Sequence, residues 1–178
     1  MRSALAIGAA LAGLAAAPAV AGGREAALAG AFHHWCLGSA PSFQALDAAA
    51  TAANLRVEKD TKTDTPAEGR MESKLWSVTT DPTGVYDLTG GFAVRNGKTV
   101  TICGLAANDA SGDEMMDLLS TPGELGEPVE TRTSDDGGER LTEFKTPFAH
   151  STILLSDGTP QHAVGVILNL TEVREPGR

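Results

Sequence analysis

The sequence predicts an α+β fold, with two N-terminal helices and one short mid-chain helix packed on a mostly antiparallel sheet of about six to seven strands. Between residues 24 and 53, apolar residues recur at spacings of three and four, which is the period of a helix. From residue 75 onward they alternate, which is the period of a strand. Short connections rich in turn residues join the alternating segments and favour antiparallel pairing.

The first 21 residues predict a secretory signal peptide that is removed. A positively charged start precedes an uncharged run over residues 4–17, and the AVA of residues 19–21 is an A-x-A cleavage signature. The run is about 14 residues long, whereas a bilayer-spanning helix needs about 20. We therefore expect a periplasmic or secreted protein, cleaved near Ala21, with residues 22–178 forming one α+β domain and no stable membrane anchor.

Three segments carry helix signals. Residues 24–37 predict the first mature helix, which Gly38 ends. Its apolar stripe consists of Leu28, Ala31, Phe32, Trp35 and Cys36. A second helix begins near residues 39–42, where Ser and Pro favour a helix start. A short third helix over residues 109–120 has an acidic first turn, and its core side carries Met115, Leu118 and Leu119.

The strand signals come after a polar stretch over residues 59–70 (KDTKTDTPAEGR), which predicts an exposed loop. Asn96-Gly97 is the strongest hairpin signal, because a type I′ turn needs positive φ at both central positions. Gly90-Gly91 lies inside the preceding strand and predicts a bulge. The final strand is apolar on both faces, so we expect it to be covered on both sides. The predicted strands are residues 75–79, 85–94, 98–105, 129–133, 140–146, 152–155 and 161–173.

The two cysteines, Cys36 and Cys103, predict one disulfide. An even pair in an exported protein is usually a structural bridge, and neither cysteine lies in a C-x-x-C motif. On the chain-entropy model the bridge stabilises the fold by about 4 kcal/mol. If the bridge draws the first helix onto the Cys103 face, Val100 and Ile102 point the other way. The sequence does not decide whether the third helix or other strands cover them.

The mature chain is acidic. Removal of residues 1–21 leaves 13 basic against 23 acidic residues, a formal charge of −10. Such a charge repels phosphate backbones and anionic headgroups, and the few basic residues are scattered. We therefore expect neither nucleic acid nor a membrane surface as a partner. A cationic partner would explain the acidity, but solubility explains it more simply.

No catalytic or metal site is predicted from the four histidines, which are His33, His34, His150 and His162. His33 and His34 point about 100° apart on a helix, so an exposed helix edge explains them better than a shared metal ion. His150 beside Ser151 is a poor dyad, because neighbouring strand residues point to opposite faces. His162 is interpreted as a strand-end residue.

Two other groups have simpler explanations than a ligand site. Asp109, Ser111 and Asp113 are similar to the start of a calcium loop, but Glu114 stands where that loop needs glycine. Helix capping explains the same residues. Trp35 fits the apolar stripe, so we favour packing over an aromatic binding surface.

Three features together resemble a known group of proteins. They are the F-x-x-W-C motif of residues 32–36 on the first helix, Cys103 in a mid-chain strand and a final hairpin at Asp157-Gly158. This arrangement resembles small uncharacterised secreted proteins of alphaproteobacteria. The resemblance implies a periplasmic domain with one disulfide, and it supplies no catalytic residues.

A non-enzymatic binding or interaction module is therefore the expected function, with an unknown protein or small molecule as partner and no cofactor. A metal-dependent or other hydrolase of the cell envelope, using His33 and His34 or His150, is one alternative. An inhibitor or stress-response protein that acts on another periplasmic protein is another. A shallow apolar patch favours the binding module, whereas converging histidines and carboxylates in a deep pocket favour the enzyme.

Overall fold

The structure is a computed structural model. It describes residues 23–38, 42–65, 69–81, 83–134, 138–146, 148–158 and 165–175. The predicted signal peptide and His162 lie outside these residues. Among the helices described, none is long and apolar enough to span a membrane.

Two helical segments open the described chain, as the sequence predicts. Helix α1 (Gly23–Phe32) runs directly into a π-helical segment, η1 (His33–Leu37). Helix α2 (Phe43–Ala52) follows, and the Ser42 side chain caps it by accepting a hydrogen bond from the Ala45 N–H at 3.3 Å. The third predicted helix is α3 (Gly112–Leu119), in the middle of the chain.

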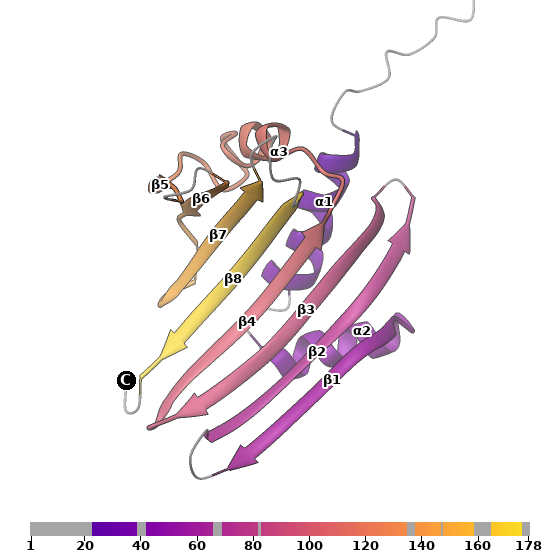
Figure 1. Ribbon diagram of the computed structural model, residues 1–178, viewed down its shortest axis with the longest axis vertical. Coiled ribbons are helices and arrows are strands. Elements are labelled where there is room, and N and C mark those ends of the chain that lie inside the picture. Colours follow the sequence, from indigo (N-terminus) through magenta and orange to yellow (C-terminus); the bar gives the residue numbers. More distant parts are fainter. Residues whose placement is uncertain are drawn as a thin grey trace, which may run out of the picture.

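The described strands form one antiparallel sheet of eight strands, in the order β1-β2-β3-β4-β8-β7-β6-β5 (Figure 1). This corrects the expected number of about six to seven. Strands β1 to β4 form one meander and β5 to β8 another, and the last strands of the two meanders pair in the centre. The strands are β1 (Arg56–Thr65), β2 (Gly69–Thr80), β3 (Gly84–Arg95), β4 (Lys98–Ala107), β5 (Glu130–Thr133), β6 (Glu139–Phe144), β7 (Ser151–Gly158) and β8 (Val166–Arg174).

The prediction of an exposed loop at residues 59–70 is wrong. Residues 59–65 belong to β1 and residues 69–70 begin β2, and the two strands pair from Arg56↔Ser77 to Thr65↔Gly69. Strand β1 is at the edge of the sheet, so it pairs on one side only and most of its side chains are exposed. Charged side chains are common on edge strands, and they hide the apolar alternation that marks a buried strand.

The Asn96-Gly97 turn is confirmed, with positive φ at both residues (52° and 76°). The bulge expected at Gly90-Gly91 is wrong, because the pairing of β3 is regular there with both neighbours. A Cβ at Gly90 would lie 2.5 Å from Leu46 Cδ2, so this glycine makes room for α2. The bulge is in β1, between Val57 and Lys59.

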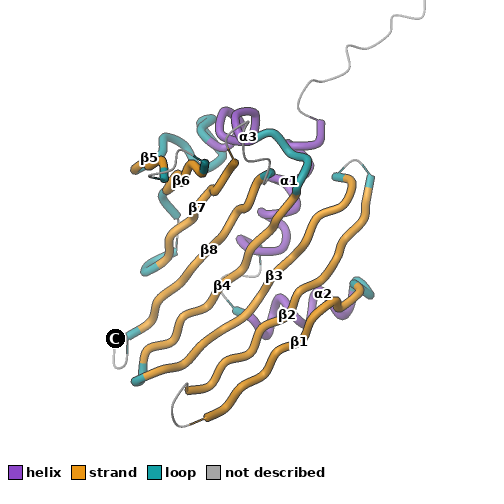
Figure 2. Tube along the Cα trace, in the orientation of Figure 1, coloured by secondary structure: helices purple, strands orange, loops and turns teal. Residues whose placement is uncertain are grey.

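All the described helices pack on one face of the sheet, which we call the helix face (Figure 2). Its core includes a row of side chains in register across β2, β3, β4, β8 and β7. The row consists of Trp76, Leu88, Leu105, Leu168 and Leu155, each 0 or 1% exposed. The predicted disulfide joins Cys36 of η1 to Cys103 of β4 on this face, with the two Cα atoms 5.4 Å apart.

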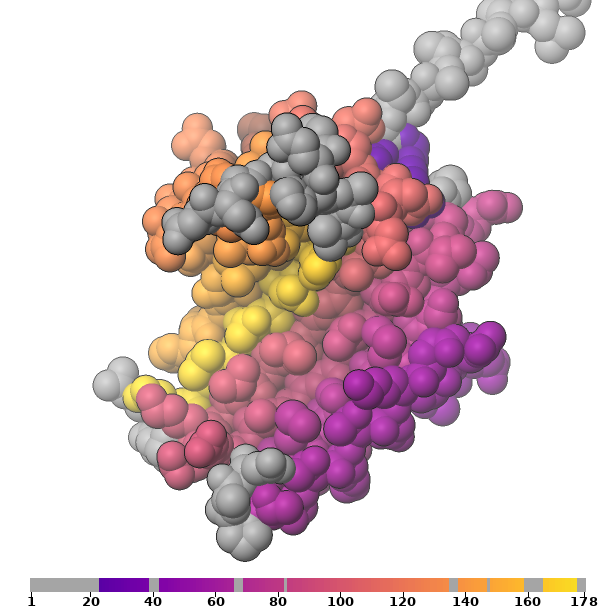
Figure 3. Space-filling model, in the orientation of Figure 1, coloured from indigo at the N-terminus to yellow at the C-terminus, as the bar shows by residue number. Residues whose placement is uncertain are grey.

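The opposite face of the sheet, which we call the open face, has no described segment packed on it (Figure 3). Val100 and Ile102 point to this face, and α3 does not cover them, because α3 packs against α1 and β7 on the helix face. Strand β8 was expected to be covered on both sides, but it is buried on the helix face only. Val173 on its open side is 40% exposed.

Candidate functional site

The three described histidines lie in different parts of the molecule. His33 Nε2 lies 2.9 Å from Glu124 Oε2, and the His34 ring packs edge-on against Trp35 at 4.6 Å. His150 is an exposed turn residue with a φ of 63°. Within the described part of the chain, no group of three or more His, Cys, Asp or Glu side chains is arranged to hold a metal ion.

The adjacent pair of His150 and Ser151 is not a catalytic dyad. The Ser151 hydroxyl donates to the Ala149 carbonyl at 3.4 Å, so its described hydrogen bond goes to the backbone and not to the imidazole. A base must accept the proton of a serine nucleophile for that serine to react. The arrangement therefore supplies no activated serine.

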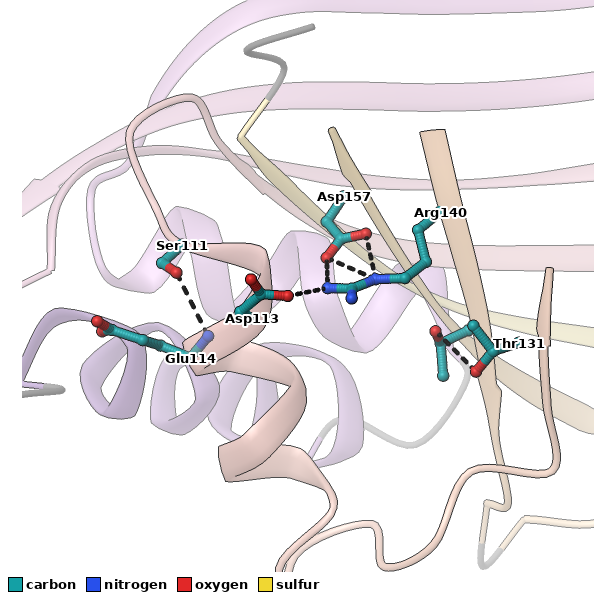
Figure 4. Close-up of polar contacts among 7 residues, drawn as sticks. Ser111, Asp113, Glu114, Thr131, Arg140 and Asp157 are labelled. Carbon is teal, nitrogen blue, oxygen red and sulfur yellow. Dashed lines mark hydrogen bonds and ion pairs between the residues drawn. The ribbon is translucent and has the colours of Figure 1, made fainter. Parts of the chain in front are cut away.

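A charged cluster lies where the N-terminus of α3 meets β6 and β7 (Figure 4). Arg140 Nε donates to both oxygens of Asp157, at 3.0 and 3.1 Å, and Arg140 Nη2 donates to Asp113 at 2.8 Å. Asp157 is 3% exposed and Asp113 is 85% exposed. The hydrogen bond that Arg140 donates to Asp157 is the main cause that raises the pKa of Arg140 above its ordinary value, although burial opposes it.

The backbone around this cluster is fitted closely to Asp157. A Cβ on Gly112 would lie 2.1 Å from Asp157 Oδ2, so only glycine fits at the first residue of α3. The Ser111 N–H donates to Glu25 at 2.9 Å, and the Ser111 hydroxyl accepts from the Glu114 N–H at 3.3 Å. Capping is therefore confirmed for Ser111.

The acidic residues of the calcium-like segment are bound to arginines. Asp109 forms an ion pair with Arg24, and Asp113 forms one with Arg140. A cavity of about 530 Å³ opens here, lined in part by Asn108, Asp109, Ser111 and Arg140. Asp109, Asp113 and Asp157 already have arginine partners. These ion pairs therefore join α1, α3, β6 and β7 to one another.

The aromatic residues belong to the core. Trp76 is 1% exposed and Trp35 is 9% exposed. The Trp35 Nε1–H donates to the Tyr86 hydroxyl at 3.0 Å, and burial raises the pKa of Tyr86. The expectation that Trp35 packs in the core is confirmed.

The open face carries an aliphatic patch, which we define as Met71, Ala93, Val100, Ile102 and Val173. Four of these residues are aligned in register across four strands: Met71 pairs with Ala93, Ala93 with Val100 and Val100 with Val173. The exposed fraction is 40% for Met71 and 36% for Ile102. Contiguous exposed aliphatic surface of this kind marks interaction sites.

Beside the patch, glycines leave positions of the open face without a projecting side chain. Gly91 pairs with Ile102, and a Cβ there would lie 2.8 Å from the Glu72 carbonyl oxygen. Gly104 pairs with Asn169, whose side-chain oxygen would lie 2.2 Å from an added Cβ. Serine and threonine occupy further positions of this face, among them Ser73, Ser77, Thr89, Thr152 and Thr171. The result is a broad surface of aliphatic and hydroxyl groups.

Most of the charged residues on the open face lie near its two edges. The β1 edge carries Arg56 and Lys59, with Glu58 at the bulge beside Arg56. The opposite edge carries three glutamates and one arginine: Glu130, Glu139, Glu143 and Arg132. Strands β2, β7 and β8 carry no charged residue at the open-face positions described. The central strands β3 and β4 place Asp87, Arg95 and Lys98 on the open face. The face therefore has a basic edge, an acidic edge and three charged residues between them.

No family model, curated relative or solved structure matches the chain.

Sequence reasoning missed both the Arg140 cluster and the open face as a surface. The two residues of the Arg140–Asp157 pair are 17 positions apart on neighbouring strands. Each of the two hairpins that bring them together was predicted, but their mutual pairing was not. The alternation of side chains along the strand did predict that Val100 and Ile102 lie on the face opposite Cys103. This alternation was the sequence signal for the open face.

Proposed function

We propose that the chain is an exported, non-catalytic binding module, and that it binds a folded protein through the open face of its sheet. One observation carries this proposal: the aliphatic patch crosses four central strands, and no described segment packs on it. A sheet face in a domain of this size is normally covered when it bears aliphatic side chains. A partner supplies the missing cover.

The surface fits a protein better than a small molecule. Small ligands bind in concave sites that bury most of their surface. The patch is instead broad and low, and its mixture of aliphatic and hydroxyl groups is typical of an interface between proteins that also exist apart. Charged groups lie at its edges, where an interface has its polar rim.

Export is the second part of the proposal. It rests on the predicted signal peptide of residues 1–21 and is supported by the disulfide, because disulfides persist in oxidising compartments such as the periplasm. Cleavage after Ala21 would start the mature chain at Gly22.

Site-specific photo-cross-linking in the cells that export the full chain tests the proposal. A photoreactive amino acid replaces Ile102 on the open face or, as a control, Val57, which is 47% exposed on the helix side of β1. We expect a protein adduct from position 102 and none from position 57. Equal adducts at the two positions, or none at position 102, would overturn the proposed binding surface.

A further inference from the structure

We infer that Asn96 is a site of spontaneous deamidation, which the folded β3–β4 hairpin suppresses and which opening of the hairpin releases. Asn96 and Gly97 form the two-residue turn between β3 and β4, and both are exposed. Among the four asparagines of the chain, Asn96 alone precedes a glycine. This chemistry does not depend on a partner of the open face.

The reaction needs only the chain and water. The backbone nitrogen of Gly97 attacks the side-chain carbonyl carbon Cγ of Asn96, and a succinimide ring closes as the bond between these two atoms forms. The bond from Cγ to Nδ2 breaks, and Nδ2 leaves as ammonia with the proton of the Gly97 N–H. Water then opens the ring at either carbonyl and gives aspartate or isoaspartate. Glycine favours the attack, because it has no Cβ to obstruct its nitrogen.

The native turn holds the reacting atoms apart. The φ of Asn96 is 52° and that of Gly97 is 76°, as a type I′ turn requires. The first central residue of such a turn has ψ near about +30°. This ψ places the Gly97 nitrogen on the far side of the Cα–C bond from the Asn96 Cβ, whereas ring closure needs the two on the same side. The folded turn therefore opposes the attack, although both residues are exposed to water.

The sheet leaves the turn little freedom to reach the reactive conformation. Arg95 pairs directly with Lys98, and the pairing of β3 with β4 is regular beyond them. Strands β2 and β8 flank the hairpin up to the residues next to this pair, so both strands of the hairpin are held on each side. A rotation of ψ at Asn96 would break the end of this ladder. Deamidation therefore requires local opening, and the free energy of opening sets the protection.

The two products differ in their effect on the fold. Aspartate at position 96 fits the same turn, because Asp-Gly is also a preferred type I′ sequence. Isoaspartate adds a methylene to the main chain of a two-residue turn, and the length of the turn fixes the register of the hairpin. It therefore disturbs the pairing of Ala93 with Val100 on the open face. A chain that has been unfolded thus carries a permanent change between two interior strands.

Peptide mapping by mass spectrometry tests the inference. The mature chain is incubated at mildly alkaline pH, folded in buffer or unfolded in urea, and the conversion of Asn96 is followed with time. We expect a rate at least about tenfold lower in the folded protein, which corresponds to an opening free energy of at least about 1.4 kcal/mol. A peptide of residues 92–101, which is marginal as an isolated hairpin, controls for the effect of urea on the chemistry. Equal rates in folded and unfolded protein, or no conversion in urea, would overturn the inference.

Two controls assign the reaction to this turn. Asn54 is also left-handed, with φ of 55°, but Leu55 follows it and obstructs the backbone nitrogen, so we expect no comparable conversion there in either sample. Asn96→Gly keeps a type I′ turn, because Gly-Gly also forms one, and it has no side chain to react. The acidic species that ion exchange separates from the wild-type chain in urea should be absent from this variant. The same species in Asn96→Gly would contradict the assignment to Asn96.

Urea unfolding of the separated products tests the effect on the hairpin. We expect refolded protein with isoaspartate at position 96 to have a lower midpoint than the wild-type chain. The matched control is Asn96→Asp, which has the same charge and an unaltered main chain, so its midpoint should equal that of the wild type. A wild-type midpoint for the isoaspartate form would overturn the proposed disturbance of the register.

Discussion

Tyr86 is the single tyrosine of the chain, and it is 4% exposed on the helix face near the start of β3. Burial is the largest cause that raises its pKa, because the phenolate is poorly solvated in the core. The hydrogen bond from Trp35 favours the phenolate and opposes this shift, but its effect is smaller. A single buried tyrosine therefore reports on the packing of η1 against β3.

We predict that the phenolate absorbance of the folded protein appears above pH 10, the ordinary pKa of tyrosine. In urea the titration should return to the ordinary value. The pKa of Tyr86 is higher in the folded protein than in the unfolded chain. Below the unfolded pKa, the free energy of unfolding therefore does not vary with pH on account of Tyr86. The free energy of unfolding then falls as the pH rises from the unfolded pKa through the folded pKa. Trp35→Phe removes the opposing hydrogen bond, so it should raise the pKa further, whereas ionisation of the native protein at or below pH 10 would contradict the buried environment.

Arg140 provides a second prediction at the scale of single residues. Arg140→Met leaves the buried Asp157 carboxylate without its cation, so the free energy of unfolding should fall by about 3 kcal/mol. The matched control is Arg132→Met, which removes an exposed ion pair with Glu130 and should leave the free energy of unfolding close to that of the wild-type protein. Urea denaturation at pH 7 measures both. Equal losses would show that the Asp157 pair is no more important than a surface pair.

At the scale of elements, the sequence was most informative where the signal is local. The Asn96-Gly97 turn and the Ser42 and Ser111 caps depend on residues within a few positions, and all three are confirmed. Gly90 was misinterpreted because its role depends on Leu46, which is far away in the chain. Strand β1 was missed because an edge strand buries little, so its composition resembles that of a loop.

The disulfide provides the prediction at this scale. It joins η1 to β4 across a sequence separation of 67 residues, so it restricts the unfolded chain strongly. Replacing Cys36 and Cys103 with alanine should lower the free energy of unfolding by about 4 kcal/mol. Urea unfolding of the double variant and of reduced wild-type protein provides two independent comparisons. An unchanged midpoint in both would contradict a stabilising role for the bridge.

At the scale of the whole molecule, the sequence predicted the fold class but not the open face. The alternation in β4 placed Val100 and Ile102 opposite Cys103. Whether they were covered depended on the positions of the helices and on which distant strand paired with β4. Both are long-range properties, and β8, the strand beside β4, begins nearly 60 residues after β4 ends. The candidate surface therefore became visible only with the strand order.

Methionine oxidation offers the most direct test of the central claim, that the open face is bound in the working protein. Met71 lies on the open face and is 40% exposed, whereas Met116 is partly buried on α3 and serves as the internal reference. Peroxide converts accessible methionine to the sulfoxide, which mass spectrometry quantifies at each position. In cells that produce the full chain, Met71 should be oxidised more slowly relative to Met116 than in dilute purified protein. The same ratio in both samples would contradict a covered open face.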